Sequence, residues 1–338
     1  MKAAVVESLQ APLAYKDVPE PTLDADEVLV RVHACGVCNG DIDAHNGLFP
    51  EIATPMPPRI PGHRSCGEVV EVGAAVGRIK VGDIVGVPLI HRSCGRCQYC
   101  FDGLHMLCSE VVLTGFGADG GYAEYVKANE RFVGLIPAGL DLDQAAHLTC
   151  TGVTAWGALK AADVKAGDWC AIYGLGAVGE YTLQFAKSFG LNVIAISAFE
   201  EALEIASNNG ADMLVNSRSV SPGEEIQQQL GGAHAVIVNS VKVNPFREAF
   251  NALRPKGTLV GIGLPMEQLP IPIFEMIVKE ITVRGSFVGS RNDLERAYET
   301  ALRDNIRIDI EEAPLSDVND VYRQIQEGLT TARILLRP

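Results

Sequence analysis

Four cysteines lie close together in one short stretch of the chain, at the spacing C-x2-C-x2-C-x7-C: Cys94, Cys97, Cys100 and Cys108. Four thiolates at this spacing can close a tetrahedron around one zinc ion, using a loop rather than a regular element. Two disulfides, or a set of small buried residues, are the alternatives. Because all four ligands are thiolates, no position is left for water or substrate, and the site is expected to be structural. The chemistry must come from other residues.

A glycine-rich hexapeptide reads Gly174-Leu175-Gly176-Ala177-Val178-Gly179. This G-x-G-x-x-G lies between an apolar strand expected at 169–173 and an apolar helix expected at 177–189, which is the context of a dinucleotide site. We expect Gly174 to permit a tight turn, Gly176 to let the backbone approach a pyrophosphate, and Gly179 to let helix and strand pack closely. The N-terminus of the helix would then present free N–H groups to the phosphates.

The choice between NAD and NADP depends on a position about twenty residues further on, where an acidic side chain usually bonds the ribose of NAD. Ser197 occupies that position, and the loss of an acid would admit a 2′-phosphate. However, no lysine or arginine lies between Lys187 and Arg218 to bind one. Glu200 and Glu201 would repel a phosphate if they pointed inward. The expected cofactor is therefore NAD or NADP, and the choice stays open.

The elements that must position these residues fall into two classes. Residues 1 to about 147 contain short apolar or alternating runs separated by glycine and proline, which predicts a β-rich region. From about residue 149 strands and helices alternate, which predicts βαβ units and a parallel sheet covered by helices on both faces. A closing strand is expected at 332–336.

We therefore expect an α/β protein of two domains. One comprises residues 1–147 and 289–338, and includes a zinc lobe at about 91–110. The other, at 148–288, is the dinucleotide-binding domain. A chain of 338 residues, of which 47% are hydrophobic, has enough material for two such cores.

Composition excludes several classes of partner. The formal net charge of −14 argues against nucleic acid and acidic membranes, which repel an acidic protein. No apolar run approaches the length of a membrane span, and the first residues do not resemble a signal peptide. Nine cysteines, an odd number, fit a reducing compartment better than a disulfide framework. The expected location is the cytoplasm.

Three further metal-ligand candidates, Cys38, His63 and Cys150, are scattered, and their spacing alone would not identify a site. The chain as a whole, however, resembles a zinc-dependent alcohol dehydrogenase of the medium-chain dehydrogenase/reductase family. The segments that carry the resemblance run nearly end to end and in order: G-V-C-x-x-D at 36–41, P-G-H at 61–63, the cysteines at 94–108, G-G-Y-A-E-Y at 120–125, T-C-T-G-V-T at 149–154 and the glycine loop at 174–179.

This resemblance implies a GroES-like catalytic domain and a Rossmann-type doubly wound parallel sheet. It implies two zinc ions per chain, the catalytic one held by Cys38, His63 and Cys150. Asp41 would orient His63, and Arg333 matches the family's arginine near the cofactor pyrophosphate.

The implied reaction interconverts small alcohols with aldehydes or ketones by hydride transfer to or from the nicotinamide cofactor. The implied assembly is a homo-oligomer, with a tetramer favoured.

Two positions depart from the family pattern. Gly40 replaces the usual serine or threonine whose hydroxyl begins a proton relay, so the proton would travel by water, by Asp43, or by a hydroxyl such as that of Thr151. Arg64 replaces the glutamate that usually follows the zinc-binding histidine. These departures motivate an alternative function, an NAD(P)H-dependent reductase of conjugated C=C or imine-like bonds on the same fold. A catalytically idle protein that binds zinc and nucleotide is a third possibility.

Overall fold

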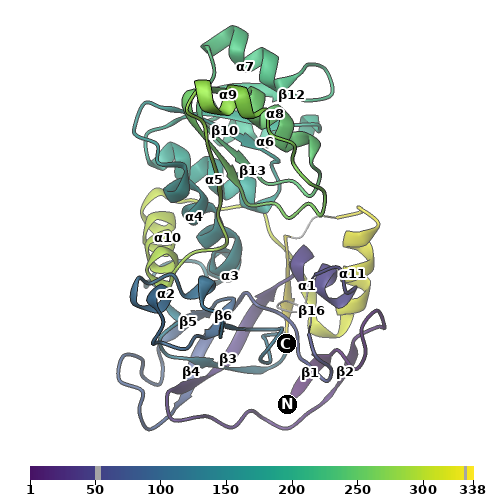
Figure 1. Cartoon of the computed structure of the whole chain (residues 1–338). Coiled ribbons are helices and arrows are strands. Elements are labelled where there is room, and N and C mark those ends of the chain that lie inside the picture. The colour runs from purple at the N-terminus through teal and green to yellow at the C-terminus, as the bar shows by residue number, and fades with distance from the viewer. Residues whose placement is uncertain (50–54, 331–332) are drawn as a thin grey trace. The chain divides into compact units, whose positions relative to one another are not determined.

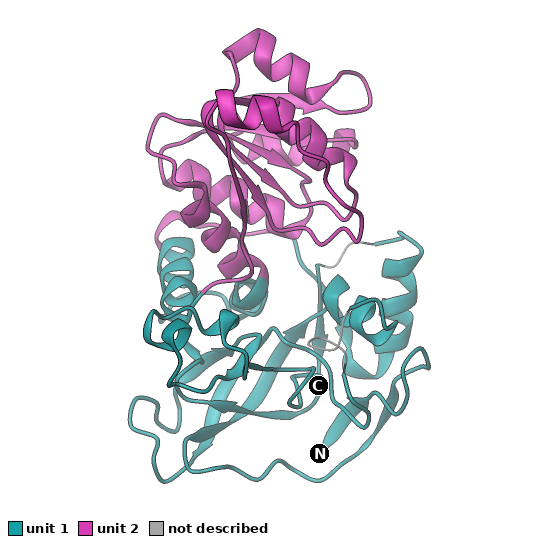
Figure 2. Cartoon of the chain, viewed as in Figure 1, with its two compact units in different colours: residues 1–150, 290–302, 309–338 teal, residues 151–289, 303–308 magenta. Residues whose placement is uncertain are grey.

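The computed structural model describes residues 1–49, 55–330 and 333–338. The chain forms two compact units, coloured separately in Figure 2. Unit 1 comprises Met1–Cys150, Ser290–Leu302 and Asp309–Pro338, and unit 2 comprises Thr151–Gly289 and Arg303–Ile308.

Residues 303–308 belong to unit 2, whereas the sequence assigned all of 289–338 to the other domain. The reason is a pair of hydrogen bonds to helix α5 (Ala177–Ser188). Gln184 Nε2 donates to Arg307 O at 2.8 Å, and Arg307 N donates to Gln184 Oε1 at 3.2 Å.

Unit 1 is built on a seven-stranded sheet with the order β16-β17-β3-β4-β5-β9, in which β8 also pairs with β3. Its strands are β3 (Glu27–Gly36), β4 (Ser65–Val72), β5 (Ile84–Val87), β8 (Tyr125–Asn129), β9 (Gly134–Leu135), β16 (Glu311–Pro314) and β17 (Ile334–Arg337). Two small sheets pair β1 (Lys2–Val5) with β2 (Ala14–Asp17), and β6 (Ile90–Arg92) with β7 (Val112–Leu113). The described helices are α1 (Asn39–His45), α2 (Gln98–Phe101), α3 (Leu142–His147), α10 (Arg291–Asp304) and α11 (Val318–Gln326), with short 3-10 turns at His105–Leu107 and Leu315–Asp317.

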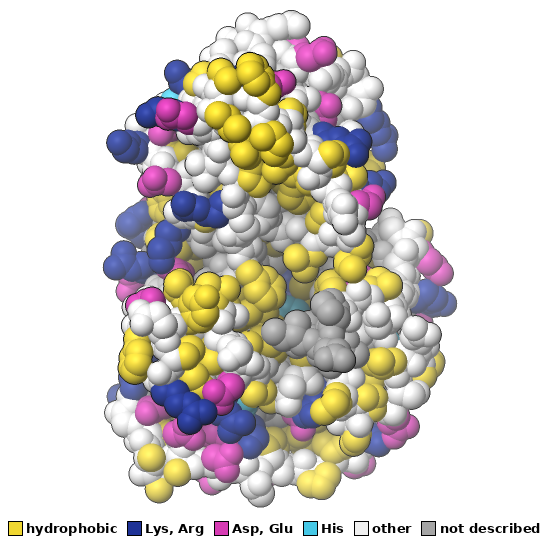
Figure 3. Space-filling view, viewed as in Figure 1, with side chains coloured by type: hydrophobic (Ala, Val, Ile, Leu, Met, Phe, Trp, Pro, Cys, Tyr) yellow, Lys and Arg dark blue, Asp and Glu magenta, His cyan; other side chains and the backbone are white. Residues whose placement is uncertain are grey.

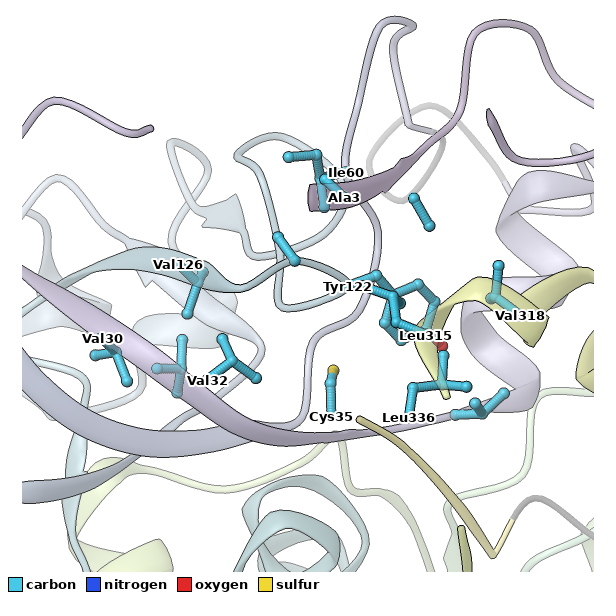
Figure 4. Close-up of a cluster of buried hydrophobic side chains, with 14 of the residues drawn as sticks. Ala3, Val30, Val32, Cys35, Ile60, Tyr122, Val126, Leu315, Val318 and Leu336 are labelled. Atoms are coloured by element: carbon cyan, nitrogen blue, oxygen red, sulfur yellow. The ribbon is translucent and has the colours of Figure 1, made fainter. Parts of the chain in front are cut away.

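The core of unit 1 follows from the alternation along β3. Val28, Val30 and Val32 are buried while Arg31 and His33 are exposed, as expected for a strand with one face against a core. Figure 4 shows part of the resulting cluster, in which labelled side chains come from distant segments of the chain: Ala3, Val30, Ile60, Tyr122, Leu315 and Leu336. The β-rich character predicted for this region is confirmed.

Unit 2 contains a six-stranded parallel sheet with the order β12-β11-β10-β13-β14-β15 (Figure 1). Its strands are β10 (Trp169–Tyr173), β11 (Asn192–Ser197), β12 (Met213–Asn216), β13 (Ala233–Val238), β14 (Leu253–Gly261) and β15 (Thr282–Gly285). The remaining described helices are α4 (Val153–Ala162), α6 (Glu200–Asn208), α7 (Pro222–Leu230), α8 (Asn244–Asn251) and α9 (Ile273–Val278).

The strand order reverses after β12, which is the doubly wound arrangement with a switch point beside β10. Right-handed crossovers then place the helices of the two halves on opposite faces. The predicted parallel sheet is therefore confirmed. The sequence does not predict α9 or β15, because their residues are almost all exposed and give no apolar periodicity.

The predicted closing strand at 332–336 corresponds to β17, and its first residue lies outside the described residues. Within the described ranges, the helices are all too short or too polar to traverse a lipid bilayer.

Candidate functional site

Asp41 joins two of the three scattered ligand candidates. Cys38 is the N-cap of α1, and its backbone N–H donates to Asp41 Oδ2 at 3.2 Å, so that Asp41 forms half of a capping box. The other carboxylate oxygen, Oδ1, lies 2.7 Å from His63 Nδ1. Tyr122 donates its hydroxyl to Oδ2 at 3.2 Å. This arrangement leaves His63 Nε2 as the ring nitrogen available to a metal.

Cys150 supplies the third donor from a turn of π-helix, Leu148–Gly152, that lies between α3 and α4. Single π-turns inside helices are frequent at functional sites. The donor atoms of Cys38, His63 and Cys150 all lie within 4.8 Å of one another. Sγ of Cys150 stands 3.4 Å from His63 Nε2. Sulfur and nitrogen bound to one tetrahedral zinc lie roughly 3.6 Å apart, given Zn–S of about 2.3 Å and Zn–N of about 2.05 Å. The three residues therefore fit a zinc ion.

The charges at this site favour metal binding. A hydrogen bond from Cys150, with the nearby charge of Arg64, lowers the pKa of the Cys38 thiol well below its usual range. Burial alone would lower the pKa of His63, but the negative charges of Asp41 and the two sulfurs raise it well above its usual value. The negative charges that favour a proton on His63 also favour a divalent cation, and binding of the cation would release that proton.

Arg64 lies inside unit 1, with 1% of its surface exposed. Its Nη2 donates to the carbonyl oxygen of Val37, next to Cys38. Nε and Nη1 are buried and make no hydrogen bond to the described residues. Burial alone would lower the pKa of Arg64, but the negative charges of Cys38, Cys150 and Asp41 outweigh it and raise the pKa. The sequence anticipated the reversed charge here, but not that the guanidinium would be enclosed beside the ligand segment.

Gly40 leaves space beside two ligands. A Cβ built on Gly40 would lie 3.6 Å from Cys38 Sγ and 3.9 Å from His63 Cε1, which is ordinary van der Waals contact. Asp43 lies on the same helix, α1, and is half-buried. Burial, and then the charge of Cys38, raise the pKa of the Asp43 carboxyl. Position 40 can therefore accept a side chain, and Asp43 is inclined to hold a proton.

The four clustered cysteines form a second group of donors. Their sulfurs lie within 4.8 Å of one another. Sγ of Cys94 and Sγ of Cys100 stand 3.9 Å apart, against about 3.8 Å for two sulfurs on one tetrahedral zinc. Contact with the Ser93 hydroxyl lowers the pKa of Cys100 to about 5, which favours the thiolate that a metal needs. Cys97 and Cys108 complete the group, so these residues also fit zinc.

The glycine loop occupies the turn from β10 into α5, in the context that the sequence predicted. Gly174 has φ of +97°, and a Cβ there would meet the carbonyl oxygen of Asn239 at 2.4 Å. Gly176 is the N-cap of α5 and has open space on its Cβ side. A Cβ on Gly179 would lie 2.0 Å from the carbonyl oxygen of Gly174. Of the other loop residues, Leu175 is buried and Ala177 and Val178 begin the helix.

Ser197 ends β11 and is buried, and its Oγ accepts a hydrogen bond from Phe199 N at 3.1 Å. The structure also brings Arg218, the first cation after Lys187 in the sequence, to the end of the sheet where Ser197 lies. Its guanidinium carbon lies 4.8 Å from the ring centroid of Phe199. The pairing of parallel strands β11 and β12 was the signal that could have found it, because their carboxyl ends share one edge of the sheet.

Arg333 belongs to unit 1, where it immediately precedes β17. Its carbonyl oxygen accepts a hydrogen bond from Glu311 N at 3.1 Å.

Comparison with known proteins assigns both halves of the chain. Residues 24–138 match the model of the alcohol dehydrogenase GroES-like domain, and residues 177–303 match that of the zinc-binding dehydrogenases. An alcohol dehydrogenase of Geobacillus stearothermophilus is 41% identical over 337 residues, which cover 100% of this chain and 99% of the relative.

Solved structures agree. The alcohol dehydrogenase of the archaeon Aeropyrum pernix superposes with a TM-score of 0.89 at 29% identity, covering all of both chains. A zinc-binding dehydrogenase from Sinorhizobium meliloti 1021, solved bound to NADP, gives a TM-score of 0.90 at 28% identity and covers 100% of this chain and 99% of its own. With these matches and two groups of residues that fit a zinc ion, the chain belongs to the zinc-dependent alcohol dehydrogenases of the medium-chain dehydrogenase/reductase family.

Proposed function

We propose that Cys38, His63 and Cys150 bind the catalytic zinc of this alcohol dehydrogenase, and that the four-cysteine cluster binds a structural one. The observation that carries the first assignment is the convergence of three donor atoms within 4.8 Å, one of them from a histidine whose other nitrogen contacts Asp41 at 2.7 Å. Three protein donors leave a tetrahedral ion one position for substrate, whereas four close it.

Zinc bound by these residues supplies Lewis acidity that polarises an alcohol or carbonyl oxygen. The nicotinamide cofactor supplies or accepts the hydride. In this proposal Asp41 holds His63 in the orientation that points Nε2 toward Cys150. Asp43 accepts the proton that leaves the substrate, because burial and the charge of Cys38 raise the pKa of its carboxyl.

Unit 2 is proposed as the dinucleotide-binding domain, and unit 1 as the catalytic domain. The residues of the loop from Gly174 to Gly179, with Ser197 at the end of the next strand, would hold the pyrophosphate and the adenosine ribose, since open space at Gly176 lets phosphate oxygens reach backbone N–H groups. On the family resemblance, Arg333 of unit 1 is proposed as a further cofactor-binding residue. The cofactor is NAD or NADP.

A homo-oligomer, with a tetramer favoured, is supported by an apolar surface on unit 2. In α9, Ile273, Phe274, Ile277 and Val278 are 58 to 79% exposed, and Figure 3 shows apolar side chains gathered over this helix. The neighbouring strand β15 is an exposed edge of its sheet. An unprotected edge flanked by apolar side chains is a surface that a second copy can cover. A cytoplasmic location is supported by the nine cysteines, none of which forms a disulfide.

The test combines metal content with turnover. We expect two zinc ions per chain and oxidation of small primary or secondary alcohols with NAD or NADP, measured by nicotinamide absorbance. One zinc per chain, with no turnover of any alcohol or aldehyde, would contradict the proposal. So would formation of a saturated aldehyde from an enal without any alcohol product.

A further inference from the structure

The carboxyl end of β11 lacks the acid that would favour NAD. Ser197 ends this strand, is only 5% exposed and carries no charge. A carboxylate at this place would accept hydrogen bonds from the two ribose hydroxyls and would repel a phosphate on the 2′ oxygen. Serine does neither, and its hydroxyl hydrogen stays free to donate, because Ser197 Oγ is the acceptor in its bond with Phe199 N.

A cation lies at the same end of the sheet. Ser197 pairs with Asn216, the last residue of the adjacent parallel strand β12, and Ser217 N donates to Ser197 O at 2.9 Å. Arg218 follows directly, and its backbone N–H donates to Asn216 Oδ1 at 2.9 Å. This turn fixes the point from which the Arg218 side chain leaves the backbone.

The guanidinium of Arg218 is placed over the Phe199 ring, with Cζ 4.8 Å from the centroid. A cation–π contact of this kind positions the group without neutralising it. Among the described residues, no carboxylate forms an ion pair with Arg218. Glu200, the first acid after Phe199, instead accepts a hydrogen bond from Asn216 Nδ2. The positive charge is thus available to a ligand.

We propose that Arg218, together with Ser197, binds the 2′-phosphate of NADP, so that this dehydrogenase prefers NADP to NAD. In doubly wound sheets the adenosine ribose lies at the end of the second strand of the nucleotide-binding half, which here is β11. A planar guanidinium matches a phosphate dianion in charge and geometry, and the serine hydroxyl adds a donor. The inference rests on the proposed role of the glycine loop in dinucleotide binding.

The test measures dissociation constants of the zinc-loaded enzyme for NADP, NAD, 2′,5′-ADP and 5′-AMP by calorimetry. The wild-type enzyme should bind NADP more tightly than NAD, and 2′,5′-ADP more tightly than 5′-AMP. Arg218→Gln should weaken NADP and 2′,5′-ADP by about 10- to 100-fold, as expected for a charged hydrogen bond, with NAD and 5′-AMP unchanged. Arg218→Lys should keep part of the preference.

Ser197→Asp should reverse the preference, because the new carboxylate repels the phosphate and accepts the ribose hydroxyls. Arg247→Gln, on the exposed side of α8, removes the same charge elsewhere in unit 2 and should change none of the four constants.

Wild-type preference for NAD, or an equal loss of NAD and NADP affinity in Arg218→Gln, would overturn the inference. If the wild type bound neither dinucleotide, the proposed role of the glycine loop would fail instead, so the two failures are distinguishable.

Discussion

Asp41 contacts His63 through one carboxylate oxygen, at 2.7 Å, and through the other accepts a hydrogen bond from the backbone N–H of Cys38, the N-cap of α1. A single side chain therefore fixes the positions of two proposed ligands from segments 25 residues apart in the sequence. Loss of such a partner typically costs about 10- to 100-fold in metal affinity or activity.

We expect Asp41→Ala to reduce zinc affinity at the three-donor site, and kcat, by about 10- to 100-fold. Metal content after dialysis against a chelator, together with steady-state rates, measures both. The matched control is Tyr122→Phe, which removes a hydrogen bond to Asp41 Oδ2 but leaves the contact with His63. If the two variants lost zinc equally, Asp41 would act through the core rather than through the histidine.

Gly40 offers a direct test of the proton path. Threonine at this position fits, because its Cβ would make only ordinary contacts with Cys38 and His63. We expect Gly40→Thr to speed alcohol oxidation near neutral pH by about 10-fold, within the range of general acid–base effects. Gly40→Ala adds the same Cβ without the hydroxyl and should not speed the reaction. Pre-steady-state rates of cofactor reduction would be compared across pH, and equal rates in both variants would rule out a hydroxyl relay.

Two glycines of the loop are expected to have different roles, Gly176 in cofactor binding and Gly179 in the packing of the fold. Gly176→Ala should leave the free energy of unfolding nearly unchanged, because nothing lies within 4 Å of the added Cβ and φ is −72°. It should weaken dinucleotide binding about 10-fold or more by keeping the pyrophosphate away from the backbone. Gly179→Ala should instead destabilise the fold by about 1–3 kcal/mol, because its Cβ would meet the Gly174 carbonyl at 2.0 Å. Titration of the cofactor and urea unfolding distinguish the two. Weakened binding in neither variant would contradict the proposed site.

His147 makes stability depend on pH. Burial, and then the charge of Arg64, lower the pKa of His147 to about 3, against 6.5 for an ordinary histidine. Between these values the unfolded chain binds a proton that the folded chain does not. The contribution is therefore fully present above about pH 6.5 and is lost, by up to about 1.4 kcal/mol per pH unit, as pH falls toward 3.

His147→Gln should make this pH slope shallower, as measured by urea unfolding of the chelator-treated protein at about pH 7 and about pH 5. An unchanged slope in His147→Gln would show that some other group titrates.

Local sequence patterns predicted the cysteine cluster, the glycine loop and the elements that flank this loop. The spacing of Cys94, Cys97, Cys100 and Cys108 and the context of the glycine loop depend on residues close in the chain, and both predictions correspond to features of the structure. Apolar runs predicted the strand before Gly174 and the helix after it. The three-donor site, by contrast, was expected only from family resemblance, because its residues lie far apart in the sequence.

Non-local contacts account for the features that the sequence does not predict. Tyr122 reaches Asp41 across 81 residues, and nothing in its neighbours signals this. Arg218 is 21 residues from Ser197 in the sequence, but strand pairing places Asn216, two residues before Arg218, beside Ser197. For Arg64, the sequence indicated an unusual charge but could not indicate its near-complete burial.

The position of Cys150 at the end of the first segment of unit 1 has a consequence for the order of assembly. The four-cysteine cluster can bind a metal ion while the rest of the chain is still unfolded, provided that its cysteines are reduced. Closing the short loop of residues 94–108 costs little entropy. The other centre must wait until three remote segments have docked. We therefore expect refolding of the metal-free chain in cobalt to show two phases of thiolate-to-metal absorption, the slower one absent in Cys150→Ala. A single phase in the native chain would mean that both centres fill only after docking. Translation would impose the same sequence, with the lobe metallated on the nascent chain and the reactive centre completed last.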